Sequence, residues 1–210
     1  MKGLLIKDWF VIWKQAKWML LLAILYLVLT ATGSSYFFVG FSVLFLSMLP
    51  ITVMGFDEKS KWNHYAVTMP FSRRDMVKSK YLLAVIAIGA ALVLYFSITS
   101  VAGLIKDQPV DYRALLYSLL PMLALGAIFI SFNLPVMFKF GVEKGRLWFV
   151  LITAILAGGV GALIGVSSDG TGRLVDWVSR LPVGLILLGI VLIFLGSLLL
   201  SMRIYEKRDL

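Results

Sequence analysis

The one long polar segment of this otherwise apolar chain is Asp57 to Lys80, which reads DEKSKWNHYAVTMPFSRRDMVKSK. It contains six of the twenty Lys and Arg residues and the one His, His64. A lone His without further ligands disfavours a metal site, and it is poor support for a lipid-modifying enzyme, which needs converging His, carboxylate or Ser groups. The absence of Cys excludes thiol chemistry, and no G-x-x-x-x-G-K-[ST] motif is present to bind ATP phosphates. These absences disfavour catalysis by this segment.

The segment allows two interpretations. It is either a solvated loop, with aromatic membrane anchors and ordinary cytoplasmic positive charge, or a folded element that docks on a soluble partner. Pro70 interrupts a helix and favours extended backbone at Met69, while Ser72 and Asp75 form a capping-box-like pattern that opens another helix. The residues thus predict two short helices around a break, and they leave the choice between loop and docking element open.

The rest of the chain is strongly apolar. It is 60% hydrophobic and only 15% charged, which is too apolar for a water-soluble domain of this length. Runs without Asp, Glu, Lys, Arg or His cover residues 18–56, 81–105, 114–138, 147–168 and 181–202. Each run can supply the roughly 20 residues with which a helix crosses a bilayer core, and period-two alternation is absent. The composition predicts an all-α integral membrane protein.

The first apolar run decides the predicted topology. Residues 18–56 would form a helix about 58 Å long, nearly twice the thickness of the hydrocarbon core, and Gly33-Ser34-Ser35 near its middle favours a turn. We therefore expect six spans, at about 18–33, 36–56, 81–105, 114–138, 147–167 and 182–202. This division places 16 of the Lys and Arg residues on one side, against 4 on the other. The positive-inside rule then predicts cytoplasmic N- and C-termini.

Two interfacial helices are expected beside the spans. Residues 1–17 predict an amphipathic elbow helix in the inner leaflet, and a signal peptide is the competing interpretation. The polar half of its helical wheel contains Lys7, Asp8, Lys14, Gln15 and Lys17. The apolar half contains Leu5, Trp9, Ile12 and Trp13. Residues 170–181 predict a short helix on the outer leaflet. None of the predicted spans contains an ionisable residue, which disfavours ion-coupled transport.

The fifth predicted span carries small residues at a spacing of four. They are Ala154, Gly158 and Ala162 on one ridge, and Ala157, Gly161 and Gly165 on the next. Such ridges let helices approach closely, so they predict a packing surface, with lining of a substrate path as the alternative. In the fourth span, Pro121 and Pro135 suggest kinks, and Asn133 is expected to bond to a neighbouring backbone group.

Several motifs resemble one family. They are Asp57-Glu58, Lys61-Trp62, Tyr65, Met69-Pro70, Ser72-Arg73 and Val77-Lys78-Ser79-Lys80-Tyr81-Leu82. In this order they resemble the loop between the second and third spans of ABC-2 type permeases, the membrane subunits of bacterial ATP-driven exporters. The two ends of the chain, Met1 to Asp8 and Ser201 to Arg208, are similar to that family too. The small six-span permeases of peptide exporters, such as the phenol-soluble-modulin exporters, are the most similar subgroup.

The resemblance implies roles for the loop residues. Asp57 to about Tyr65 corresponds to a coupling helix that docks in a groove of a cytosolic ATPase, with Trp62 and Tyr65 as apolar anchors. Asp57 and Glu58 would make polar contacts beside Lys61, and the chain would return to the third span through Pro70, Ser72 and Arg73. ATP and Mg²⁺ would be bound by two copies of the ATPase, and this chain, which would bind no cofactor itself, would pair with a second copy or a similar permease in the bacterial plasma membrane.

The substrate is the least defined expectation. An uncharged, aromatic interior suits a hydrophobic or amphipathic substrate, such as a cytolytic or antimicrobial peptide. Contact with lipid is the alternative role for the aromatic residues concerned, which are Tyr26, Tyr36, Phe37, Phe38, Phe41 and Phe45. The alternative function is that of a non-transporting membrane scaffold, sensor or immunity subunit, which would bind a partner without ATP-driven flux.

Overall fold

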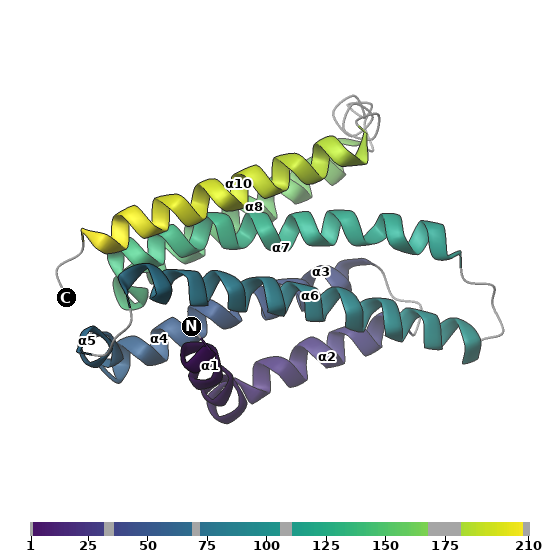
Figure 1. The fold of residues 1–210 in the computed structure, drawn as a ribbon. Coiled ribbons are helices and arrows are strands. Elements are labelled where there is room, and N and C mark those ends of the chain that lie inside the picture. Colours follow the sequence, from purple (N-terminus) through teal and green to yellow (C-terminus); the bar gives the residue numbers. More distant parts are fainter. Residues whose placement is uncertain (1, 32–35, 69–71, 106–110, 168–181, 208–210) are drawn as a thin grey trace.

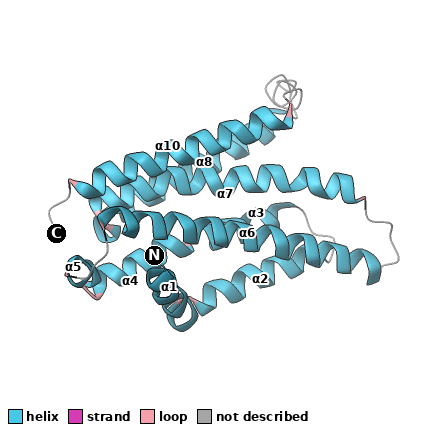
Figure 2. Cartoon of the chain, viewed as in Figure 1, coloured by secondary structure: helices cyan, strands magenta, loops and turns pink. Residues whose placement is uncertain are grey.

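The computed structural model describes residues 2–31, 36–68, 72–105, 111–167 and 182–207. Over these ranges the regular structure is helical, without strands (Figure 2), which confirms the all-helical prediction. The expected turn at Gly33 to Ser35, the outer interfacial helix at 170–181, and Pro70 lie outside the described residues.

The helices follow one another along one bundle (Figure 1). They are α1 (Lys2–Gln15), α2 (Lys17–Ala31), α3 (Tyr36–Ser47), α4 (Leu49–Lys59), α5 (Trp62–Val67), α6 (Arg73–Ile105), α7 (Tyr112–Phe140), α8 (Val142–Ser167) and α10 (Val183–Glu206). Four stretches of the described chain are long and apolar enough to cross a membrane: Phe38–Lys59, Arg73–Ile105, Tyr112–Phe140 and Val183–Glu206. A fifth is counted if α1 and α2, which meet at a bend of 77°, are taken as one broken span.

The polar segment differs from its predicted local structure. Helix α4 continues to Lys59, so Asp57 and Glu58 end this helix instead of beginning a separate one. The backbone of Lys61 then adopts φ 53°, a left-handed conformation that interrupts the helix before α5 begins at Trp62. The expected second short helix is the first part of α6, which runs from Arg73 without a break into the apolar residues. Nothing between Arg73 and Ile105 breaks a helix, because this stretch contains no Pro.

Helix α1 differs from its predicted amphipathic division. Its buried residues are Leu4, Asp8 and Ile12, which follow at intervals of four and therefore lie on one face of the helix. The expected polar half placed Asp8 toward water, whereas the structure buries it completely. The exposed apolar stripe consists of Ile6, Trp9, Phe10 and Trp13.

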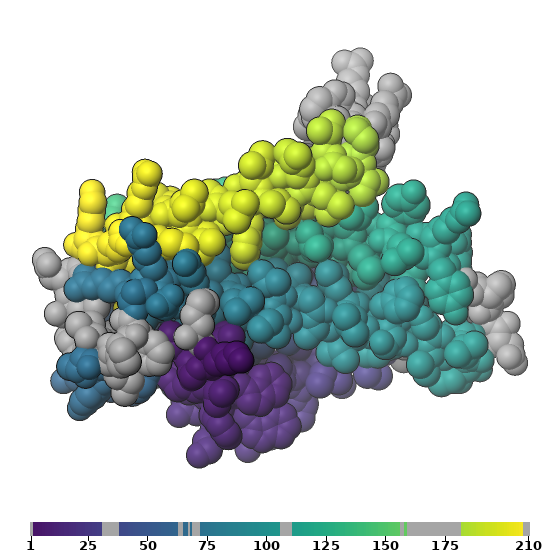
Figure 3. All heavy atoms as spheres, in the orientation of Figure 1, coloured from purple at the N-terminus to yellow at the C-terminus, as the bar shows by residue number. Residues whose placement is uncertain are grey.

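Helix α7 packs against α3, α6, α8 and α10, and α6 contacts α1, α2, α3 and α4 as well as α7 and α10 (Figure 1). The space-filling view places α10 along one edge of the molecule and α1 with α2 along the opposite edge (Figure 3). Inside α7, the side-chain amide of Asn133 donates to the carbonyl oxygen of Phe129 at 2.9 Å. This bond confirms the expected link from Asn133 to backbone. The central position of α6 makes it the element that connects the polar segment to the other helices.

Candidate functional site

Segments from six parts of the chain surround a small cavity at one end of the bundle. Its volume is about 30 Å³, enough for a water molecule. Side chains from α1, α4, α5, α6 and α10 and the turn between α7 and α8 line it. The polar part of its wall consists of Lys7, Asp57, Glu58, Ser79 and Lys80. Residues that are remote in the sequence therefore form one polar site.

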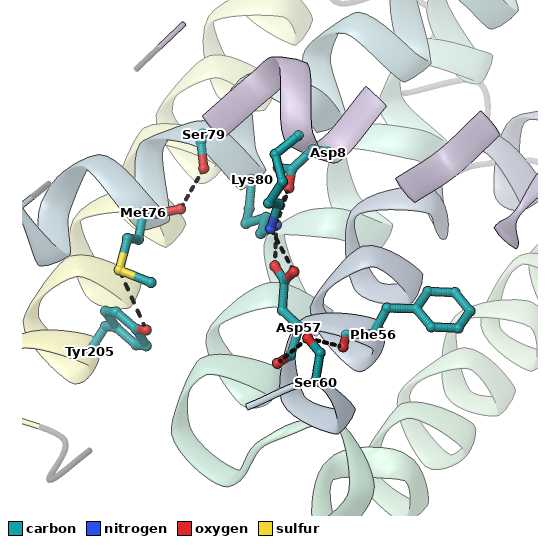
Figure 4. Close-up of polar contacts among 9 residues, drawn as sticks. Asp8, Phe56, Asp57, Ser60, Met76, Ser79, Lys80 and Tyr205 are labelled. Carbon is teal, nitrogen blue, oxygen red and sulfur yellow. Dashed lines mark hydrogen bonds and ion pairs between the residues drawn. The ribbon is translucent and has the colours of Figure 1, made fainter. Parts of the chain in front are cut away.

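Four charged side chains beside this cavity form an ionic cluster, the ion quartet, which consists of Lys7, Asp8, Asp57 and Lys80. The Nζ atom of Lys80 lies 2.8 Å from Oδ1 of Asp8 and 2.7 Å from Oδ2 of Asp57 (Figure 4). The Nζ atom of Lys7 lies 2.5 Å from Oδ1 of Asp57 and 2.9 Å from Oδ1 of Asp8. With two positive and two negative charges, the quartet is neutral, and it joins α1, α4 and α6.

Three members of the quartet are buried. The exposed fractions are 0% for Asp8, 6% for Asp57 and 7% for Lys80. Withdrawing a charge from water is costly unless opposite charges and hydrogen bonds compensate it. Here each of the four charges contacts two charges of the opposite sign. Asp57, predicted as an ATPase contact, thus points into the bundle and positions the end of α4. Its direct contact with an ATPase stays a prediction.

The neighbouring carboxylate has a different partner. Oε2 of Glu58 accepts a hydrogen bond from the backbone N–H of Val142, with 2.5 Å between oxygen and nitrogen. Val142 is the first residue of α8, where backbone N–H groups lack helical partners and the helix dipole favours a negative charge. The turn before it depends on Gly141, whose φ of 79° suits glycine. Glu58 therefore attaches the end of α4 to the start of α8.

The two aromatic residues predicted as ATPase anchors have different environments. Trp62 is half-buried, and the Nζ atom of Lys7 lies 4.9 Å from the centroid of its ring, a cation–π contact. Tyr65, three residues further along the same helix, is 63% exposed. Lys61, at the start of α5, is also exposed. The structure thus uses Trp62 to hold α5 against the bundle and leaves Tyr65 accessible.

The predicted cap of α6 is confirmed. Oγ of Ser72 lies 3.1 Å from the backbone nitrogen of Asp75, and Oδ2 of Asp75 lies 2.8 Å from Oγ and 3.3 Å from the backbone nitrogen of Ser72. Arg73 donates from Nη1 to the carbonyl oxygen of Glu206 at 3.1 Å, and Arg74 pairs with the Glu206 carboxylate. The return segment is therefore tied to the end of α10 as well as to its own helix.

A second polar group, the hydroxyl network, consists of Tyr81, Ser131, Ser197 and Ser201. Oη of Tyr81 lies 2.6 Å from Oγ of Ser197 and 2.8 Å from Oγ of Ser201. Oγ of Ser197 donates to the backbone carbonyl of Ser131 at 2.7 Å. These bonds join α6, α10 and α7, and all four residues are buried.

The small residues of the fifth predicted span belong to α8. Ala154 and Gly158 are exposed, and no described atom lies within 4 Å of the position that a Cβ would take at Gly158. At these two positions the ridge is open in the single chain. Gly161, Ala162 and Gly165 continue the same helix, and the packing role of the five residues stays a prediction.

Sequence reasoning gave no functional role to six residues of these two polar groups, namely Lys7, Asp8, Lys80, Tyr81, Ser197 and Ser201, although Lys80 and Tyr81 belong to a motif that carries the family resemblance. A signal from spacing was present for Asp8 and for the two Ser residues. Asp8 stands between Leu4 and Ile12 at intervals of four, so it occupies a face that is otherwise apolar. Ser197 and Ser201 share one face of an uncharged helix in the same way. The partners of these side chains, however, lie in other helices.

One protein family matches nearly the whole chain. The family described as ABC-2 family transporter protein matches residues 3–206 of the chain. The chain belongs to the ABC-2 transporter family. As a member of this family with several apolar helices it is a membrane protein, and the family implies an ABC ATPase as its partner. No curated protein matches the chain.

Proposed function

We propose that this ABC-2 family protein is the permease subunit of an ATP-driven exporter that works with a separate cytosolic ATPase. The observation that carries the proposal is the exposed ring of Tyr65 on α5, at the end of the bundle where the basic segments converge. An exposed aromatic side chain beside the polar, exposed Ser60 and Lys61 has the composition of a small docking surface. The ATPase would bind ATP and Mg²⁺, and its movement would reach the permease through this surface.

The orientation in the membrane follows from charge. The described parts of residues 1–17, 57–80, 139–146 and 203–210 contribute to one end of the bundle, and these segments hold most of the Lys and Arg residues. We propose that this end faces the cytoplasm of a bacterial cell and that the chain crosses the plasma membrane six times. Helix α1 would be the elbow, with Trp9 and Trp13 in the inner leaflet, because these rings are exposed and α1 turns away from α2.

The assembly we propose contains two permease copies and two ATPases. The open ridge at Ala154 and Gly158 supports a second copy, because small residues allow a neighbouring helix to approach closely. Symmetric assembly of identical subunits is also the commonest arrangement of oligomers.

An amphipathic peptide is the proposed substrate. Tyr26 of α2 lies against three rings of α3, with centroid distances of 5.9 Å to Phe38, 6.0 Å to Phe41 and 5.8 Å to Phe45. This aromatic surface suits the apolar face of such a peptide. We expect the chain, expressed with its ATPase, to protect cells from an amphipathic cytolytic peptide, and Tyr26→Ala to reduce that protection. Equal peptide toxicity with and without the transporter would contradict the proposed substrate.

The coupling role can be tested by cysteine crosslinking, because the chain has no native Cys. Single cysteines replace Ser60, Tyr65 or Ser72, all of which are exposed, and a bifunctional reagent is applied to native membranes that contain the ATPase. We expect adducts at Ser60→Cys and Tyr65→Cys whose yield changes with ATP. The matched control is Leu104→Cys, which is 72% exposed near the opposite end of α6 and should give no adduct.

The absence of an adduct at all three positions, with the ATPase present and folded, would overturn the permease proposal. It would favour the scaffold or sensor function. An adduct at Ser72→Cys alone would move the docking surface from α5 to the start of α6.

A further inference from the structure

Lys80 and Tyr81 are consecutive residues of α6 that bond to different sides of the bundle. Consecutive side chains leave an α-helix about 100° apart, so one helical turn can contact two sets of neighbours. Lys80 reaches Asp8 of α1 and Asp57 of α4, whereas Tyr81 reaches Ser197 and Ser201 of α10. The ion quartet and the hydroxyl network therefore meet at one peptide bond.

The ionic side fixes α6 to the end of α4. Only one residue separates Asp57 from Lys59, the last residue of α4, and α5 begins after a turn of two residues. Trp62 of α5 contacts Lys7, which is itself bonded to Asp57. A displacement of α5 would therefore move Trp62 against Lys7 of the ion quartet. Because Lys80 belongs to the same quartet, the displacement would also act on α6.

The hydroxyl side fixes α6 to α10 and α7. The ring of Tyr81 is buried and meets the ring of Phe194 edge-on, with 5.3 Å between centroids. Its hydroxyl group contacts two Ser residues of α10, one of which donates to the backbone of α7. A shift of α6 at the level of Tyr81 would therefore act on α10 and α7 through hydrogen bonds.

We propose that Lys80 and Tyr81 are positioning residues that transmit movement of the coupling segment, α4 and α5, to α10 and α7. The inference rests on the proposed function, since the movement would originate in the docked ATPase. Packed elements with two discrete arrangements can carry such coupling, and the evidence for it must come from measured coupling rather than from position alone.

The test uses two reporters in the complex of full-length chain and ATPase, reconstituted in lipid nanodiscs. Tyr65→Cys reports docking through its ATP-dependent crosslink. Gly184→Cys, an open and exposed position at the far end of α10, reports movement there through its rate of maleimide labelling with and without ATP. We expect ATP to change both signals when the chain is otherwise unaltered.

The first variant is Tyr81→Phe, which removes only the hydroxyl group. It should preserve the crosslink of Tyr65→Cys and reduce the ATP-dependent change at Gly184→Cys about fivefold or more. The matched control is Tyr95→Phe on the same helix, because Tyr95 is also buried and its hydroxyl has only a 3.5 Å contact with Ser118. This control should retain both responses.

The second variant separates transmission from charge compensation. Lys80→Met with Asp8→Asn removes one charge of each sign, so the remaining pair, Lys7 and Asp57, stays neutral while α6 loses its ionic bond. It should fold and crosslink, and it should lose the response at Gly184→Cys. The single variant Lys80→Arg, which retains the positive charge at this position, should keep part of the ATP-dependent response at Gly184→Cys.

Three results would overturn the inference while leaving docking intact. The first is an ATP-dependent crosslink without any response at Gly184→Cys in the otherwise unaltered chain. The others are a full response at Gly184→Cys in Tyr81→Phe, or a full response in the Lys80→Met and Asp8→Asn double variant. Loss of the crosslink in the unaltered background would instead refute the proposed function. The two failures are therefore distinguishable.

Discussion

The two sides of α6 each bury a polar group, which is charged on one side and neutral on the other. Facing α1 and α4, Lys80 carries a buried charge that Asp8 and Asp57 compensate. Facing α10, Tyr81 carries a buried hydroxyl group that Ser197 and Ser201 compensate. The ionic side borders the polar part of the cavity wall, and the hydroxyl side lies beside the apolar ring of Phe194.

This difference shows that the free-energy cost of burying a polar group depends on the partners around it. A buried charge is tolerated where opposite charges and space for water are adjacent, because the cost of removing it from water is otherwise several kcal/mol. A hydroxyl group costs less and needs only one or two hydrogen-bonding partners. The charged side should therefore be more sensitive to the loss of one member than the neutral side, and the following predictions test that order.

The largest effect is expected for Lys80→Met. It leaves Asp8 and Asp57 facing each other with Lys7 as the one remaining cation of the quartet, which should lower the free energy of unfolding by about 3–5 kcal/mol. An SDS titration followed by Trp fluorescence measures this change. Lys78→Met removes an exposed charge two residues earlier and serves as the control. A loss below about 1 kcal/mol in Lys80→Met would show that the quartet does not hold α6 to α1 and α4.

A smaller effect is expected for Tyr81→Phe. The loss of one hydroxyl group should lower the free energy of unfolding by about 1 kcal/mol, since Ser197 still donates to the carbonyl oxygen of Ser131. The same titration measures it against Tyr95→Phe. If Tyr81→Phe were as damaging as Lys80→Met, the proposed contrast between the two sides of α6 would be wrong.

Glu58→Gln should have a still smaller effect. The amide oxygen can still accept a bond from Val142, but the charge that favours the start of α8 is lost, at a cost of about 0.5 kcal/mol. Hydrogen exchange at the backbone amide of Val142 should become faster. Glu143→Gln, at an exposed position in the same turn, is the control. Unchanged exchange in Glu58→Gln would show that the carboxylate charge does not stabilise the start of α8.

The smallest effect is expected for Glu206→Gln. Its carboxylate pairs with Arg74 on the surface, where water and salt screen the attraction. We expect no resolved change in the SDS midpoint at physiological ionic strength. A clear loss of stability that persists in high salt would mean that this contact closes the end of the bundle.

Much of the local structure was predictable from the sequence, and the site was not. The spacing of Ser72 and Asp75 predicted the start of α6 because a capping box acts within four residues. The motif around Asp57 to Lys80 led to the ABC-2 family, which the match over residues 3–206 confirms. The same motif suggested that Trp62 and Tyr65 act alike, but their environments differ because Lys7, 55 positions before Trp62, lies over one ring and not the other.

Composition and charge distribution alone thus lead to an apolar helical bundle with a basic end, because hydrophobic length and local helix capping are properties of contiguous residues. The direction of each polar side chain is a property of neighbouring helices. Asp8 can be buried because Lys7 and Lys80 both pair with it, and Tyr81 is satisfied because α10 presents Ser197 and Ser201 on the facing side. Tertiary packing decided which charges face water and which hold the bundle together, since a buried polar group is stable only beside a partner that the fold supplies.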